Sequence, residues 1–198
     1  MERSTLLKSI ALLTCLAMSF IGFAQNPGTS GAVVTQNITL KVDGSALLAV
    51  VNTNASAGSS TTVSMSLSGA TQAGAAIVDQ VTNADTRLRI SSLVESGKTR
   101  TITASIAPTL STSGTQFFVT LTKPASFLPV VANGGTPAAE QELTDGTPKT
   151  VVTAITTCWS GTGATDGYVV TYRYAKNSGA TFLQSKNIVI TYTITAEV

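Results

Sequence analysis

The sequence predicts an all-β fold, a single antiparallel β-sandwich of about nine strands without a disulfide. Three observations support this fold. Many short segments alternate apolar with small polar residues at a period of two, which places one face of a strand in the core and the other in solvent. Turns rich in Gly, Ser and Asn separate these segments. No stretch of ten residues keeps a sustained 3.6-residue apolar period, so we expect two antiparallel sheets packed face to face rather than helices.

In the N-terminal half, the alternation is clearest at residues 63–67, where Val, Met and Leu alternate with Ser. A helix could not bury these three apolar side chains on one face, whereas a strand can. The runs at 38–42, 47–51 and 87–93 are rich in apolar and β-branched residues, and turn-forming residues stand between them. We therefore expect four strands before residue 95.

The C-terminal half predicts five further strands. They lie at 102–106, 117–121, 151–155, 168–174 and 188–194. Each is rich in β-branched or aromatic residues; in the last of them, isoleucines and a tyrosine alternate with valine and threonine. Residues 124–149 differ because they contain four prolines, which forbid a continuous central strand. We predict a long Pro- and Gly-rich surface loop there.

The first 24 residues have the pattern of a signal peptide, with basic residues before an apolar run and small residues ahead of a cleavage position after Ala24. The apolar run is shorter than the roughly 20 residues that cross a bilayer, and no second such run follows. We therefore predict a secreted protein, extracellular or at the outer cell surface, with residues 25–198 as one domain and no transmembrane segment after leader removal. Lipidation at Cys15 is the less favoured alternative, because Thr14 precedes it where a lipobox requires Gly, Ala or Ser.

Loss of the leader leaves Cys158 as the single cysteine of the predicted domain. The domain then has no internal disulfide, and its stability depends on the apolar core. The thiol of Cys158 could be buried as a small apolar group or could bridge two chains, and we favour burial.

The composition argues against several kinds of functional site. The chain has no histidine, which excludes a Ser-His-Asp triad, a His-activated cysteine nucleophile and a zinc site of the usual type. Only 11% of residues are charged and the net charge is +2, too thin a basic surface for nucleic acid. Glu140, Glu142 and Asp145 are close in sequence but lack the spacing of a calcium loop. We therefore predict no catalytic residue, no metal and no cofactor; a carboxylate-dependent hydrolase stays open as an unfavoured alternative, because two acids could meet in a cleft.

Trp159 is the residue best suited to contact a ligand. It stands at the end of a predicted strand, beside a Gly-rich turn at 160–167, and an exposed indole can stack on a sugar ring. Tyr168, Tyr172 and Tyr174 follow it, but their period-two spacing favours packing in or near the core. Trp159 is therefore our tentative contact for a glycan.

The C-terminal block carries a resemblance to known proteins. Residues 153–164, 167–172 and 188–195 include a Cys-Trp-Ser-Gly-Thr-Gly-Ala turn and a final Val-Ile-Thr-Tyr-Thr-Ile-Thr strand. These motifs resemble those of a group of small secreted β-rich proteins of Bacteroidota-type bacteria, which implies secretion but no established activity. More loosely, the chain resembles fimbrial and spore-coat-type subunits, which implies an immunoglobulin-like or fimbrial-subunit-like sandwich.

The resemblance to fimbrial subunits draws attention to the segment that precedes the strand at 47–51. Apolar residues alternate there with polar ones, with Gln36 as an interruption, and the candidate donor-strand positions are Val34, Ile38, Leu40 and Val42. Such a segment could complete the sheet of a neighbouring molecule through main-chain hydrogen bonds and alternate side-chain pockets. It could equally be the first strand of its own sandwich, which is the interpretation that we favour.

These features together predict an exported, non-enzymatic structural or adhesive protein of the cell surface or extracellular matrix, with a filament- or fimbria-type subunit as one specific form. Its expected partners are further copies of itself or components of the cell surface or matrix. The alternative from another class is a carbohydrate-binding module that uses Trp159 and the adjacent loops.

Overall fold

The computed structural model describes residues 36–40, 44–53, 62–76, 78–110, 114–177 and 186–198. The chain divides into two units, residues 1–41 and 42–198, and each is described by itself. In the first unit, residues 36–40 form no strand, so they do not contribute to the strand predicted at 38–42. The predicted leader at 1–24 lies outside the described residues.

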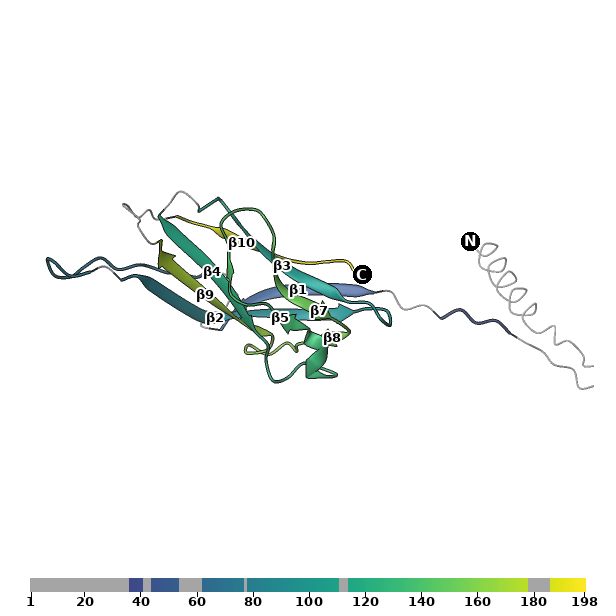
Figure 1. Ribbon diagram of the computed structural model, residues 1–198. Helices are drawn as coiled ribbons and strands as arrows, with labels where there is room; N and C mark the ends of the chain where they lie inside the picture. The colour runs from purple at the N-terminus through teal and green to yellow at the C-terminus, as the bar shows by residue number, and fades with distance from the viewer. Residues whose placement is uncertain (1–35, 41–43, 54–61, 77, 111–113, 178–185) are drawn as a thin grey trace, which may run out of the picture. The chain divides into compact units, whose positions relative to one another are not determined.

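The second unit is almost entirely β, and its named strands pair in antiparallel ladders (Figure 1). The larger sheet has six strands in the order β1-β2-β9-β4-β6, with β8 paired to β2. These strands are β1 (Ser45–Asn52), β2 (Gln80–Leu93), β9 (Tyr168–Lys176), β4 (Thr115–Thr122), β6 (Gln141–Glu142) and β8 (Cys158–Trp159). The smaller sheet has the order β10-β3-β7-β5, with β10 (Val189–Ile194), β3 (Arg100–Ala107), β7 (Lys149–Ile155) and β5 (Thr136–Pro137). None of the helices in the described part of the chain is long and apolar enough to span a membrane.

One apolar core is built from the inward-facing residues of both sheets. As the period-two pattern predicts, β2 buries every second residue from Thr86 to Ser92, and β3 does so from Arg100 to Ile106. The rings of Phe117 on β4 and Tyr172 on β9 stack with centroids 5.5 Å apart. The prediction of an all-β fold is confirmed, and the described residues contain no disulfide.

Strand β7 departs from strict alternation, because the neighbouring residues Val151 and Val152 are both buried. The register between β3 and β7 shifts between Arg100 and Ile102 and again after Ile102, which is the signature of a β-bulge. Ala154 has a φ of 55°, in the left-handed region that a residue with a Cβ rarely adopts. The bulge thus turns two consecutive side chains of β7 into the core.

The alternating run at 63–67, predicted to be a strand, is not one. Val63, Met65 and Leu67 are partly buried while the serines between them are exposed, and the first two pack against the core. The alternation in sequence therefore indicates only that one face of this segment lies against the protein. Partial burial of every second side chain does not require hydrogen bonds to a neighbouring strand. Figure 1 shows this segment in blue-teal, leading from β1 towards β2.

The segment 124–149, predicted as a long surface loop, contains short elements that pack against the core. They are the 3-10 helix η2 (Val131–Gly134) and the strands β5 and β6. Phe127 and Leu143 are buried, at 2% and 1% exposure. Two-residue strands at the sheet edges explain how a proline-rich segment can join both sheets, because an edge position tolerates a residue without an N–H group.

Phe127 packs directly on the backbone of Gly134. A Cβ added to Gly134 would lie only 2.6 Å from the Phe127 ring, so glycine is required for this contact. The Tyr168 hydroxyl donates a hydrogen bond to the Gly134 carbonyl, and the Phe127 and Tyr168 ring centroids are 5.0 Å apart. We call this region, comprising residues 124–149 with β5 and β6, the closed side.

Candidate interaction site

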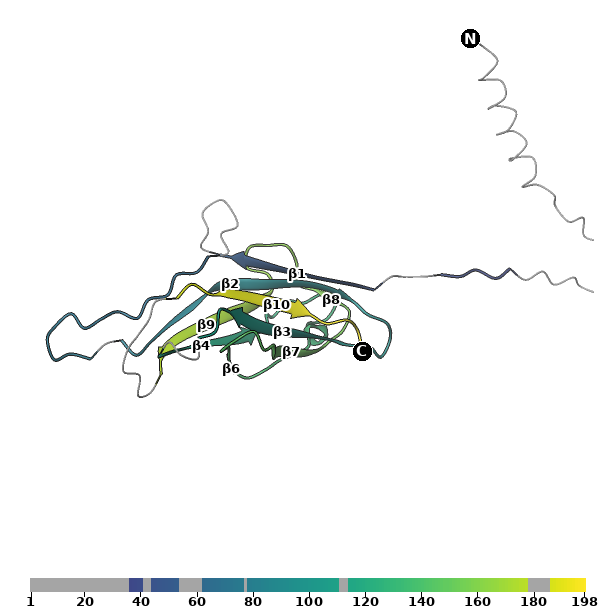
Figure 2. The same ribbon diagram turned by 90° about the horizontal axis from the view of Figure 1, so that it is seen from above.

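Each sheet has one long edge strand, β1 in the larger sheet and β10 in the smaller sheet. Among the described strands, β1 pairs only with β2, and β10 pairs only with β3, so each has one edge without a partner strand. β1 and β10 also adjoin each other, although no ladder joins them. Both can be followed in Figure 2, β1 in blue and β10 in yellow.

The inward-facing side chains of these two strands are less buried than those of the central strands. The apolar residues that are only partly buried there are Leu48, Val50, Ile190, Tyr192 and Ile194. On the neighbouring strands, the inward-facing Leu88 and Ile102 are both at 0% exposure. We call these five residues, with the free edges of β1 and β10, the open side. The core is therefore incompletely covered on this side by the described residues.

The backbone groups at the open side follow from the register. The Thr195 N–H donates to the Thr101 carbonyl at 2.9 Å, so the odd-numbered residues of β10 direct their N–H and C=O groups towards β3. The even-numbered residues, including Tyr192, direct theirs away from β3. Just after β1, the Thr53 N–H donates to the Asp85 carbonyl at 2.7 Å. By the same alternation, the N–H and C=O groups of Leu48 point away from β2. Each free edge can therefore accept an added strand.

The candidate donor-strand positions are only partly described. Ile38 and Leu40 are 71% and 89% exposed, and neither belongs to a strand. Val34 and Val42 lie outside the described residues. The segment 36–40 thus presents two large apolar side chains to solvent, which is unfavourable by roughly 1.5–3 kcal/mol for each side chain relative to full burial.

Trp159, the predicted glycan contact, is 45% exposed. Its backbone exchanges two hydrogen bonds with Leu128, at 2.9 and 3.0 Å, and Leu128 is itself 52% exposed. Val130 and Val131 follow closely in sequence and are also exposed. Tyr168 and Tyr172 are buried, so they do not join Trp159 in a common exposed aromatic surface. Trp159 therefore lies in a small exposed apolar group rather than on an aromatic platform.

Cys158, the residue before Trp159, is fully buried and free. Burial raises the pKa of its thiol to about 11, because an apolar environment disfavours the thiolate. At neutral pH the group is therefore a protonated thiol with little nucleophilic character. This position favours burial over a bridge between chains.

The acidic residues of the closed side each have a separate partner. Glu140 forms an ion pair with Arg173, Glu142 accepts a hydrogen bond from Gln116, and Asp145 accepts one from the Thr147 N–H. The hydrogen bond and the charge of Arg173 lower the pKa of Glu140, although partial burial opposes this shift. No group of three metal-ligating side chains occurs among the residues that the structure describes.

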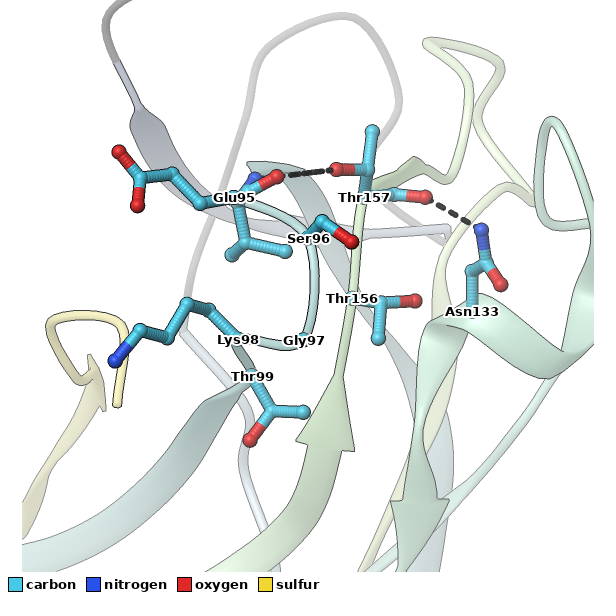
Figure 3. Close-up of a pocket in the computed structure, with 9 residues that line it drawn as sticks. Glu95, Ser96, Gly97, Lys98, Thr99, Asn133, Thr156 and Thr157 are labelled. Carbon is cyan, nitrogen blue, oxygen red and sulfur yellow. Dashed lines mark hydrogen bonds between the residues drawn. The ribbon is translucent and has the colours of Figure 1, made fainter.

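A shallow pocket of about 290 Å³ lies where the β2–β3 turn meets η2 and the turn between β7 and β8 (Figure 3). Thr157 holds its wall together, since its hydroxyl accepts from the Val94 N–H at 3.1 Å and its carbonyl accepts from Asn133 at 2.8 Å. The Thr156 hydroxyl is buried and has no hydrogen-bond partner among the described residues. The pocket offers hydroxyl and amide groups, with Glu95 as the one acid in its lining.

Comparisons with protein-family models, with curated proteins and with solved structures find no match for this chain. The functional argument therefore depends on the geometry of the described residues. Sequence reasoning singled out the segment 34–42 and Trp159, but it missed the open side. The open side is recognised from the strand order, which leaves β1 and β10 each with one edge that no described strand pairs. A single sequence does not reveal strand order.

Proposed function

We propose that the protein is an exported, non-enzymatic structural protein of the cell surface or extracellular matrix, built as a β-sandwich and able to associate with further copies of itself. A filament- or fimbria-type subunit is the specific form that we favour. The observation that carries the proposal is the open side. Two sheet edges adjoin there with partly buried apolar side chains, and the described residues supply no strand to cover them.

Free sheet edges are a liability that monomeric proteins usually protect. Common protections are charged side chains, proline, bulges or covering loops along the edge strand. β1 and β10 contain no charged residue and no proline, and Leu47 and Val189 are exposed on their outer faces, at 65% and 68%. An edge with these properties is suited to β-strand addition, in which main-chain hydrogen bonds provide much of the affinity.

The composition supports a structural rather than a catalytic role. The chain contains no histidine, and the acids of the closed side are each engaged in a local contact rather than facing one another. Thr and Ser residues cover the solvent-facing sides of several strands, which keeps the β geometry while the surface remains hydrated.

The test is the assembly state of the chain from residue 25 to residue 198. Light scattering and negative-stain microscopy should reveal ordered oligomers or filaments, and deletion of residues 25–42 should abolish them while circular dichroism stays β-rich. A chain that stays a monodisperse monomer at all accessible concentrations would contradict self-association.

A carbohydrate-binding function is the second candidate, favoured by the 45% exposure of Trp159 beside the exposed Leu128. A glycan array with the purified chain should then give a hit that Trp159→Ala abolishes. Leu47→Ala, which removes a comparably exposed apolar side chain on β1, is the matched control and should leave the hit unchanged. An array without any hit would count against this candidate.

A further inference from the structure

We propose that the open side accepts the segment 34–42 of a second copy of this chain, and that this segment pairs antiparallel with the free edge of β10. The inference rests on the proposed self-association and names the two surfaces that meet. It follows from one combination of features. The outer edge of β10 is paired with no described strand, and the core-facing apolar side chains of β10 are partly buried. The segment before β1 carries exposed apolar residues at the same period of two.

The accepting edge is β10 because its side chains and backbone groups are positioned for an added strand. Ile190, Tyr192 and Ile194 face the core but are only partly buried, and their N–H and C=O groups point away from β3. A strand added at this edge can bond to these groups and lay its own inward-facing side chains over the exposed margin of the core. The Tyr192 hydroxyl lies 3.1 Å from the Tyr172 hydroxyl, which ties β10 to the larger sheet and keeps the edge in place.

The occupant matches this edge in pattern and in charge. Gln36, Ile38 and Leu40 stand on one side of an extended segment, and Val34 and Val42 continue the same alternation in sequence. β10 carries no charge, and the one charged residue of the segment 34–42 is Lys41. Its odd-numbered position places it on the same side as Asn37 and Thr39, away from the core, so no ion is buried when the two strands pair. Ile38 and Leu40 are exposed in the single chain, so burying them against such a surface is favourable.

Connectivity favours a second copy over the segment's own domain. A Cβ added to Gly44 would lie 3.4 Å from the Arg100 guanidinium and 3.6 Å from Glu197, so β1 begins near the residues that follow β10. The segment of the same chain could therefore reach β10 only with its end near Glu197, running parallel to the strand. The ladders between the named strands are all antiparallel, and antiparallel pairing is slightly more stable for each residue. A second copy can adopt this direction freely.

Disulfide trapping tests both the partner and the direction. One set of chains carries Asn37→Cys or Thr39→Cys on the donor segment. The other set carries Thr191→Cys or Thr193→Cys on the solvent-facing side of β10, or Thr195→Cys one residue after β10, where the side chain is partly buried. Each donor chain is mixed with each acceptor chain under mild oxidation, so a product joining a donor to an acceptor cysteine is intermolecular. Buried Cys158 stays in place, and the wild-type chain measures its background.

In the antiparallel arrangement, the preferred partner of Thr39→Cys lies two residues earlier in β10 than that of Asn37→Cys. A preferred partner two residues later means parallel pairing and overturns the proposed direction. Ile38→Cys, which faces the core, should give at least roughly tenfold less product and serves as the matched control. If chains that carry both Thr39→Cys and Thr195→Cys form an internal disulfide and stay monomeric, the segment occupies its own domain and the second-copy proposal is wrong.

A charge introduced on the donor segment separates this inference from the proposed function. The double variant Ile38→Asp, Leu40→Asp should assemble at least roughly tenfold more weakly, because two carboxylates would have to be buried without partners. Its thermal unfolding should match the wild type, since both side chains are exposed in the single chain. The matched control Asn37→Asp, Thr39→Asp places the same charges on the opposite side and should assemble nearly normally.

The outcomes are distinguishable. Loss of assembly in the first variant alone, together with cross-links of antiparallel register, supports the inference. If both variants assemble like the wild type, the chains associate through another surface; the inference is then overturned and the proposed function survives. If the wild-type chain itself never assembles, both are overturned.

Discussion

The closed side and the open side are two edges of the same pair of sheets, and they differ in the length of their edge strands and in how well the core beneath them is covered. At the closed side, β5 and β6 are each two residues long, and the segment between β4 and β7 folds over the core and buries Phe127 and Leu143. At the open side, the edge strands β1 and β10 are eight and six residues long, and their inward-facing apolar residues stay partly exposed. The described residues complete one edge and leave the other uncovered.

The difference shows how a sheet edge is protected from association. Short edge strands present few unpaired backbone groups, and a covering loop removes those that remain. The closed side uses both of these means, and Gly134 allows Phe127 to pack closely on the backbone. Among the residues that the structure describes, the open side uses neither, which is the reason that we place the interaction surface there.

The largest expected effect is at the closed side. Phe127→Ala should lower the free energy of unfolding by about 3–5 kcal/mol, because it leaves a cavity beside Tyr168. Urea unfolding followed by tryptophan fluorescence would measure it, since Trp159 pairs with Leu128, the residue after Phe127. A loss below about 1 kcal/mol would mean that the segment 124–149 does not seal the core.

Gly134→Ala should cost about 1–3 kcal/mol, because its Cβ would overlap the Phe127 ring. Gly146→Ala is the matched control, since a Cβ added there meets nothing within 4 Å. Equal thermal midpoints for the two variants would contradict the close packing of Phe127 on Gly134.

At the open side, Leu48→Ala should cost only about 1 kcal/mol in the monomer, because the side chain is partly buried and its surroundings can relax. In assembled material the same substitution should cost more, since an added strand would complete the burial of Leu48. Comparing the unfolding midpoint below and above the concentration of assembly measures this difference. An equal loss in both states would place Leu48 outside the interface.

The smallest effect concerns the ion pair that ties the closed side to β9. Arg173 lowers the pKa of Glu140 below its usual value of 4.5, so this pair stabilises the fold above that pH and the stabilisation is lost as the pH falls through the lowered folded-state pKa. Glu140→Gln should cost roughly 0.2–1 kcal/mol at pH 7, since the pair is partly exposed and screened by solvent.

The difference between Glu140→Gln and the wild type should shrink as the pH falls through the lowered pKa of Glu140, because the wild-type carboxylate is then neutralised as well. Thermal unfolding at pH 3, 5 and 7 would follow it. Asp79→Asn, in the more exposed pair with Lys176, is the control and should show a smaller effect at every pH. A cost for Glu140→Gln that is constant with pH would contradict the role of the charge.

Much of the fold could be predicted from the sequence because burial in a strand has a simple period. The strands at 102–106 and 117–121 lie within β3 and β4, and their apolar residues Ile102 and Val119 are in the core. The prediction was wrong at 63–67, where the period reports one buried face but cannot report whether a partner strand is present. It also missed the bulge in β7, since Val151 and Val152 break the alternation through a shift of register that depends on β3.

The candidate site was harder to predict than the fold. Ile38 and Leu40 are visible in sequence as an alternating segment, but their significance depends on an edge formed by β1 and β10, which are far apart in the chain. A free edge is a property of strand order, and strand order is set by pairings such as Ile190 with Ile106. Periodicity within a segment contains no information about them.

The pairing of β10 with β3 also bears on how the molecule forms. Every strand from β4 to β9 lies between these two partners in sequence, so their ladder closes a long stretch of chain. Topologies rich in such distant contacts fold slowly, on the scale of milliseconds to seconds. Until β10 docks, β3 is itself an uncovered edge, so a concentrated solution of partly folded chains would be prone to mispairing. Slow refolding at low concentration should therefore give the highest recovery of native protein.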